Sequence, residues 1–118
     1  MNYNLELNTR PFQAIKAGTK KIEGRTPKDE SDKRYVTMKS GDTITFTNNV
    51  THEQLQCAVL SVAHYEDVRT MLEKEGVNNV LSSGLDIEEG IKSYHSLEGY
   101  EERIKSFGIY AIGVKPSL

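Results

Sequence analysis

Two consecutive β-type runs in the middle of the chain constrain the fold more than any other feature. Residues 39–48, KSGDTITFTN, begin with a turn signal and then alternate, so that Ile44 and Phe46 share one face and threonines occupy the other. Residues 55–65, LQCAVLSVAHY, form a longer and more apolar run, which favours a central strand. Only the polar segment NNVTHEQ separates the two runs, so we expect them to pair as neighbours in a sheet.

Further strands are expected near both ends, and helical spacing fills the intervals. Alternation predicts a first strand at residues 3–8, and β-rich runs predict others around 20–26 and at 109–114. Helices are predicted in three segments, and the polar stretch PKDESDKR is expected to be a loop. The expected helices lie at residues 9–18, ended by a glycine, at 66–76, and at 85–108 as a pair broken near 96–99.

This order of elements predicts an α+β fold, a small mixed β-barrel with helices covering its openings. The 118 residues are enough for one hydrophobic core, so we expect a single domain over 1–118. A hydrophobic fraction of 36% with 27% charged residues excludes a disordered chain.

The sequence favours a cytoplasmic protein without metal or cofactor. There is no run of ~18 apolar residues for a membrane span, and the N-terminal residues do not resemble a secretory signal. The single cysteine, Cys57, has no partner for a disulfide. The three histidines lack the spacing of a zinc site, and no P-loop or dinucleotide motif is present.

Positive charge gathers in the first third of the chain. Nine Lys and Arg stand against four Asp and Glu between Arg10 and Lys39, whereas the remainder has six against thirteen. Within this basic segment, residues 18–25, GTKKIEGR, are the densest in charge. Such an excess is typical of a solvated face, and it is also typical of a site for phosphate or another anion.

Strand alternation would place Lys21, Glu23 and Arg25 on one side, and a bulge could bring Lys20 round to meet Glu23. An exposed ladder of salt bridges would use the same residues. A polar ligand would also suit them, because glutamate accepts from amino groups and arginine donates in a fork to phosphate or carbonyl oxygens.

The same residues carry a resemblance. A GxKxxExR signature is formed by Gly18, Lys20, Glu23 and Arg25. Because of this signature, the chain resembles the ASCH domain family, which belongs to the PUA-like superfamily of small β-barrels. The flanking blocks occur in the order of the family: Pro11–Phe12 with Ile15, Gly41 to Asn48, Tyr65 with Asp67 and Leu72, and Tyr94 to Ile112.

The resemblance implies a binding module for RNA or a modified nucleoside. The signature residues of the family line a cleft between the first helix and the barrel, where Glu23 would read the edge of a base. Lys20, Lys21 or Arg25 would then meet its phosphate. Aromatic residues at the rim would stack on the base, and the candidates are Tyr35, Tyr94 and Tyr100.

The resemblance also leaves an enzyme open. One bacterial branch is similar to acetylcytidine amidohydrolases, whose Lys corresponds to Lys20, but Glu23 stands where those enzymes have Thr. A hydrolase of that type, or a ribonuclease, would use Lys20 as a general base with Glu23 or Glu98 as the acid. A third alternative is a protein-interaction adaptor that uses the acidic remainder of the chain. The sequence gives no indication of the oligomeric state.

Overall fold

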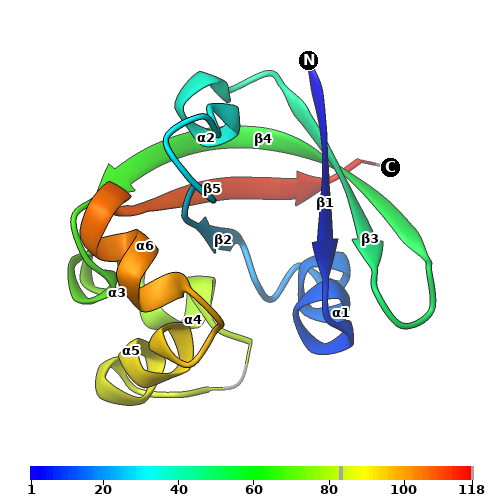
Figure 1. Cartoon of the computed structure of the whole chain (residues 1–118). Helices are drawn as coiled ribbons and strands as arrows, with labels where there is room; N and C mark the ends of the chain where they lie inside the picture. Colours follow the sequence, from blue (N-terminus) through cyan, green and yellow to red (C-terminus); the bar gives the residue numbers. More distant parts are fainter. Residues whose placement is uncertain (83, 118) are drawn as a thin grey trace.

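The computed structural model describes residues 1–82 and 84–117 and contains one strongly curved five-stranded sheet (Figure 1). The strand order is β1-β3-β4-β5-β2; β1 and β3 are parallel, and the other pairs are antiparallel. The strands are β1 (Asn2–Leu7), β2 (Ile22–Arg25), β3 (Thr43–Asn48), β4 (Gln54–Tyr65) and β5 (Ile109–Pro116). Because β1 and β2 are both edge strands, the expected barrel is a half-barrel.

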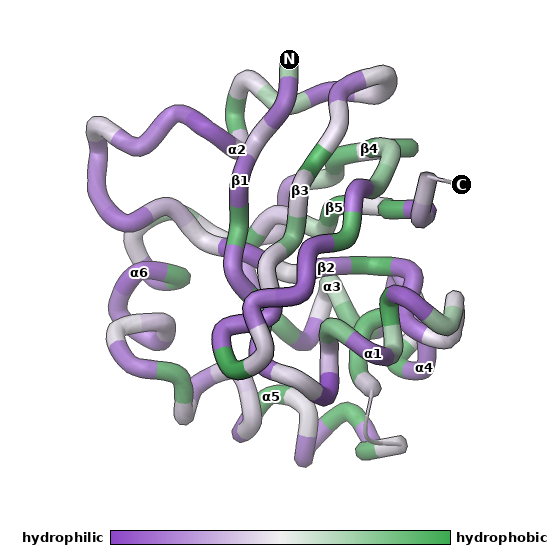
Figure 2. Tube along the Cα trace, turned by 90° about the vertical axis from the view of Figure 1, so that its right-hand side faces the viewer, coloured by the Kyte–Doolittle hydropathy of each residue, from purple (hydrophilic) through white to green (hydrophobic). Residues whose placement is uncertain are grey.

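The alternation in the sequence accounts for the strands. In β3, Ile44 and Phe46 are fully buried while the threonines between them are half-exposed, as predicted. β3 pairs with β4 as a hairpin, and β4 also pairs with β5, which confirms its central position. Figure 2 shows hydrophobic residues along β4 and β5 and hydrophilic ones along the loop that leads to α2.

Helices gather at two places around the sheet (Figure 1). Helix α1 lies below β1 and β3, and helices α3 to α6 lie at the end of the sheet where β4 ends and β5 begins. The helices are α1 (Thr9–Ala17), α2 (Arg34–Thr37), α3 (Val68–Glu75), α4 (Val77–Val80), α5 (Ile87–His95) and α6 (Tyr100–Phe107). The break expected near residues 96–99 separates α5 from α6.

Two hydrophobic clusters correspond to this division. One contains Phe12 and Ile15 of α1 together with the inward side chains of β1, β3 and β4. The other contains Met71 and Leu72 of α3 with Val80 of α4 and Ile109 of β5. Fully burying side chains of this size stabilises the fold by about 1.5–3 kcal/mol each. The first helix and the group α3 to α6 therefore belong to different clusters, with β2 and β5 between them.

The short helices α2 and α4 were not predicted. Each has four residues, which is too short for helical periodicity to be visible in the sequence. Each is anchored by a buried side chain, Tyr35 in α2 and Val80 in α4, so tertiary packing rather than local preference holds them.

Candidate ligand-binding cleft

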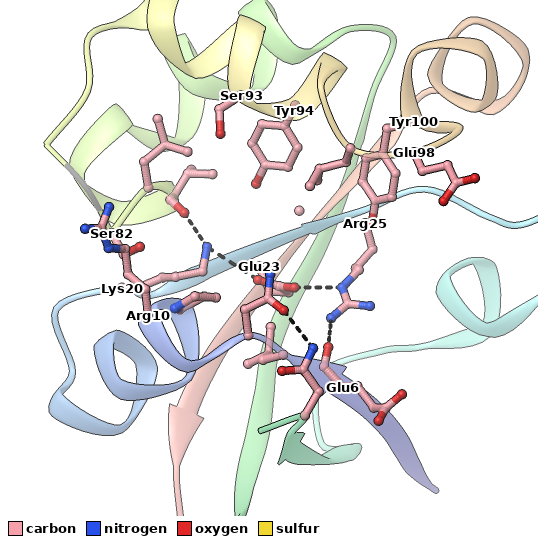
Figure 3. A pocket seen from close by; sticks show the side chains of 18 residues that line it. Glu6, Arg10, Lys20, Glu23, Arg25, Ser82, Ser93, Tyr94, Glu98 and Tyr100 are labelled. Carbon is pink, nitrogen blue, oxygen red and sulfur yellow. Dashed lines mark hydrogen bonds and ion pairs between the residues drawn. The ribbon is translucent and has the colours of Figure 1, made fainter. Parts of the chain in front are cut away.

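A cleft of about 510 Å³ opens between the two edge strands of the half-barrel (Figure 3). Residues of β1, α1 and β2 line one part of it, and residues from the end of α4, from α5 and from the start of α6 line the other. The cleft therefore lies between α1 and the helices of the second cluster. Its volume falls within the range of about 300–1,000 Å³ that is usual for small-molecule sites.

The end of α1 sets the position of the signature residues. Gly18 has φ 83° and caps the helix, because its amide donates to the carbonyls of Ala14 and Ile15. The amide of Lys20 also donates to the carbonyl of Ala14, at 3.1 Å. The chain thus turns tightly before β2 begins at Ile22, and this turn points the Lys20 side chain into the cleft.

Lys20 is buried, and acceptors surround its ammonium group. Nζ donates to the carbonyl oxygen of Ile22 at 2.6 Å and to the carbonyl oxygen of Val80. It also lies 3.4 Å from Oε1 of Glu23. An ammonium group has three hydrogens to donate, so these contacts can use all of them. Lys20 therefore ties the start of β2 to the end of α4.

Glu23 and Arg25 continue this line of charges. Nε of Arg25 donates to Oε2 of Glu23 at 2.7 Å, and Glu23 is buried. Nη2 of Arg25 donates to the carbonyl oxygen of Glu6 at 2.7 Å. Because Glu6 lies on β1 and Arg25 on β2, this bond connects the two edges of the sheet. We call the connected side chains Lys20, Glu23 and Arg25 the charge relay, by which we mean a row of ion-paired side chains and not a path for protons (Figure 3).

Burial and charge act against each other in the charge relay. Burial alone would raise the pKa of Glu23, but the positive charges of Arg25 and Lys20 outweigh it and hold this pKa below its ordinary value. Burial lowers the pKa of Lys20, and the attraction of Glu23 offsets only part of that effect. The pKa of Arg25 is raised: burial opposes the charged form, and the carboxylate of Glu23 overcomes it.

Two tyrosines form an aromatic wall beside the relay. The rings of Tyr94 and Tyr100 stack with centroids 6.4 Å apart and planes at 23°. Gly24 makes room for this wall, since a Cβ atom there would lie 2.5 Å from the hydroxyl oxygen of Tyr94. The guanidinium of Arg103 lies 4.8 Å from the centroid of the Tyr100 ring and donates to the carbonyl of Thr26. Arg103 thus connects Tyr100 to the segment that follows β2.

The structure brings together most of the residues singled out in the sequence. Lys20, Glu23, Arg25, Tyr94, Tyr100 and Glu98 all line the cleft. Lys21 and Tyr35 do not. Lys21 is exposed, and its backbone pairs with Asn79, whereas the side chain of Tyr35 is buried in the first cluster. The strict strand alternation expected from Lys20 onward does not occur, because β2 begins two residues later.

Sequence reasoning did not single out several other residues of the cleft. Arg10 was counted only within the basic segment, and Asn8, Asn49, Ser82 and Ser93 carried no motif. The backbone carbonyl groups that accept hydrogen bonds from Lys20 and Arg25 could not have been predicted, because every residue has a carbonyl group. Among residues 1–82 and 84–117, no three His, Cys, Asp or Glu side chains gather as a metal site would require. Within the same residues, no helix is long and apolar enough to cross a membrane.

The family model described as ASCH domain matches residues 5–117. The chain belongs to the ASCH domain family. The crystal structure of hypothetical protein PH0355 is 38% identical in sequence, with a TM-score of 0.83 over 99% of this chain and 100% of that one. The solution NMR structure of protein PF0455 from Pyrococcus furiosus is 37% identical, with a TM-score of 0.74 over 98% of this ASCH protein and 97% of that chain.

A more distant neighbour shares the fold alone. The crystal structure of the ZmASCH S128A mutant from Zymomonas mobilis has 15% identity and a TM-score of 0.61, over 98% of this chain and 70% of that one. No curated protein matches the sequence. The comparisons therefore support the expected ASCH fold of the PUA-like type and leave the ligand to be argued from the cleft.

Proposed function

We propose that the cleft binds RNA or a modified nucleoside by receiving one base between the charge relay and the aromatic wall. The observation that carries this proposal is the arrangement of Arg25, which keeps unused donors inside a cleft of nucleoside size. The general association of ASCH domains with RNA supports the same ligand class. In this proposal Arg25 contacts the ligand, and Lys20 stabilises the structure of the site.

Arg25 has donors to spare. A guanidinium carries five N–H groups, and the contacts to Glu23 and Glu6 use one on Nε and one on Nη2. Within the described residues, three N–H groups thus remain without a hydrogen bond, on a side chain that is 17% exposed and lines the cleft. A planar fork of donors matches paired acceptors on the edge of a base, and Tyr100 beside it supplies a surface for stacking.

The surroundings of Lys20 weigh against the hydrolase alternative. A general base needs a lone pair that reaches the substrate, and although burial lowers the pKa of Lys20, its Nζ donates to two carbonyl oxygens and lies beside the carboxylate of Glu23. The nitrogen is therefore directed at groups of the protein and not at the open part of the cleft. The carboxylate of Glu23 forms ion pairs with Lys20 and Arg25, and Glu23 stands where the amidohydrolase branch has Thr. Catalysis through Lys20 would require the contact with Val80 to break first.

Calorimetric titration with the four ribonucleosides and acetylcytidine tests the proposal. Arg25→Lys keeps the charge and removes the fork, so we expect affinity to fall about tenfold or more, because a good bidentate pair contributes about 1–3 kcal/mol. Arg69→Gln is the control, because Arg69 is exposed and lies outside the cleft. Unchanged affinity in Arg25→Lys would contradict the proposal. Consumption of acetylcytidine by the wild-type protein would favour the hydrolase.

A further inference from the structure

The α1 side of the cleft carries an arginine that the charge relay does not use. Arg10 lies in the first turn of α1, lines the cleft and is exposed. Within residues 1–82 and 84–117, its side chain has no hydrogen bond or ion pair to another residue. Asn49, which also lines the cleft, is occupied, since its Nδ2 donates to Oδ1 of Asn8 at 2.7 Å. As far as residues 1–82 and 84–117 show, Arg10 is thus a cleft-lining cation without a partner, whereas the amides of Asn8 and Asn49 pair with each other.

Charge differs between the two ends of the cleft. Figure 3 shows Arg10 on the side of Lys20 and Glu98 on the opposite side, beyond Tyr100. Glu6 meets Arg25 through its carbonyl oxygen, and its carboxylate points away from Arg10 (Figure 3). A ligand with a negative charge at one end and a neutral ring at the other can place the charge at Arg10, away from the carboxylate of Glu98. Its ring would lie against the aromatic wall, and its charged group would lie at Arg10.

We infer that Arg10 is the contact for a phosphate group and that the ligand class is a phosphorylated nucleoside, not a free one. This inference rests on the proposed function and narrows it. A guanidinium binds phosphate oxygens through charge-assisted hydrogen bonds, which are stronger than neutral ones. The phosphate can belong to a mononucleotide or to the backbone of single-stranded RNA, and both present the same oxygens to Arg10.

The test compares ribonucleosides with their 5′-monophosphates and with a single-stranded RNA hexamer of the same base, by calorimetry at low salt. For the wild-type protein we expect a monophosphate or the hexamer to bind about tenfold more tightly than the nucleoside, a difference of about 1.4 kcal/mol. Arg10→Gln should remove this advantage and leave nucleoside affinity unchanged within about twofold. Arg69→Gln makes the same change of charge on an arginine outside the cleft and should preserve the advantage.

The outcomes separate this inference from the proposed function. A loss confined to the hexamer assigns Arg10 to an RNA backbone phosphate, and a loss that includes the monophosphate assigns it to the nucleotide itself; both support the inference. If nucleosides bind and Arg10→Gln alters the affinity of neither phosphorylated ligand, the inference is wrong and the proposed function stands. If nucleosides, monophosphates and hexamer all fail to bind, both are wrong.

Raising the salt concentration adds a readout that a merely structural role of Arg10 would not move. Because Arg10 is exposed, its attraction to phosphate is screened by salt. The affinity of the wild-type protein for the phosphorylated ligand should fall with salt, and that of Arg10→Gln should fall less steeply. Equal salt slopes in the two proteins would contradict the inference.

Discussion

Glu23 is the residue on which the charge relay depends. Its carboxylate lies between two cations, and all three side chains are largely removed from water. Two buried positive charges without a carboxylate between them would repel each other and lack compensation. The main role of Glu23 is therefore to hold Lys20 and Arg25 together in the folded site. A contact between Glu23 and a base, as the sequence suggested, would have to use the oxygen lone pairs that Lys20 and Arg25 leave free.

Replacing Glu23 with Gln should reduce the free energy of unfolding by about 3–5 kcal/mol at neutral pH, because one partner of a buried ion pair is removed. Glu102→Gln, which removes an exposed glutamate 3.9 Å from Lys105, should change it by less than about 1 kcal/mol. Urea denaturation measures both. A loss for Glu23→Gln no greater than that for Glu102→Gln would show that the relay contributes nothing to stability.

The difference between wild type and Glu23→Gln should also depend on pH. The pKa of Glu23 in the folded state is below the ordinary 4.5, so its stabilisation is fully present above pH 4.5. As the pH falls through the lowered folded pKa, Glu23 becomes protonated and its contribution is lost. Urea midpoints measured from pH 7 to pH 3 should therefore converge for the two proteins at the acid end, and parallel curves would contradict this assignment.

At the scale of elements, the cleft depends on where α1 stops. Gly18 ends the helix with positive φ, and nothing lies within 4 Å of the position that a Cβ atom would occupy. An alanine there would fit the space but not the backbone conformation. The stop of the helix was predicted from this glycine, and the direction in which it turns Lys20 became visible only in the structure.

Gly18→Ala should lower the free energy of unfolding by about 1 kcal/mol through backbone strain. Gly41→Ala is the matched control, because Gly41 also has positive φ and open space but lies outside the cleft. We expect similar losses of stability in urea for the two variants, and a loss of nucleoside affinity only for Gly18→Ala. Equal affinities would mean that the turn does not position Lys20.

The sequence predicted the long elements well and the contacts of the site only in outline. β3 and β4 were recognised because alternation and apolar density persist over many residues, whereas α4 depends on the burial of Val80. The meeting of Lys20 with Glu23 was anticipated through a bulge and is achieved by a turn. The acceptors on Glu6 and Val80 are backbone groups, which no residue pattern could indicate.

At the scale of the whole molecule, the cleft occupies the gap that the half-barrel leaves open. The sheet ends at β1 and β2, and the bond from Arg25 to the carbonyl of Glu6 spans the two edges. The first hydrophobic cluster fixes α1 on one side, and the second fixes α4 to α6 on the other. The relay therefore joins the separately packed parts of the fold at the place where we propose that the base binds.

The most direct test of this account is an NMR titration that follows the side-chain Nε–Hε signal of Arg25 and the backbone amides while ribonucleoside monophosphates are added. We predict large changes for Arg25, Gly24 and Tyr100, with little change for Lys21, which is exposed and lies outside the cleft. Saturable changes confined to other surfaces, with the Arg25 signal unmoved, would contradict the central claim.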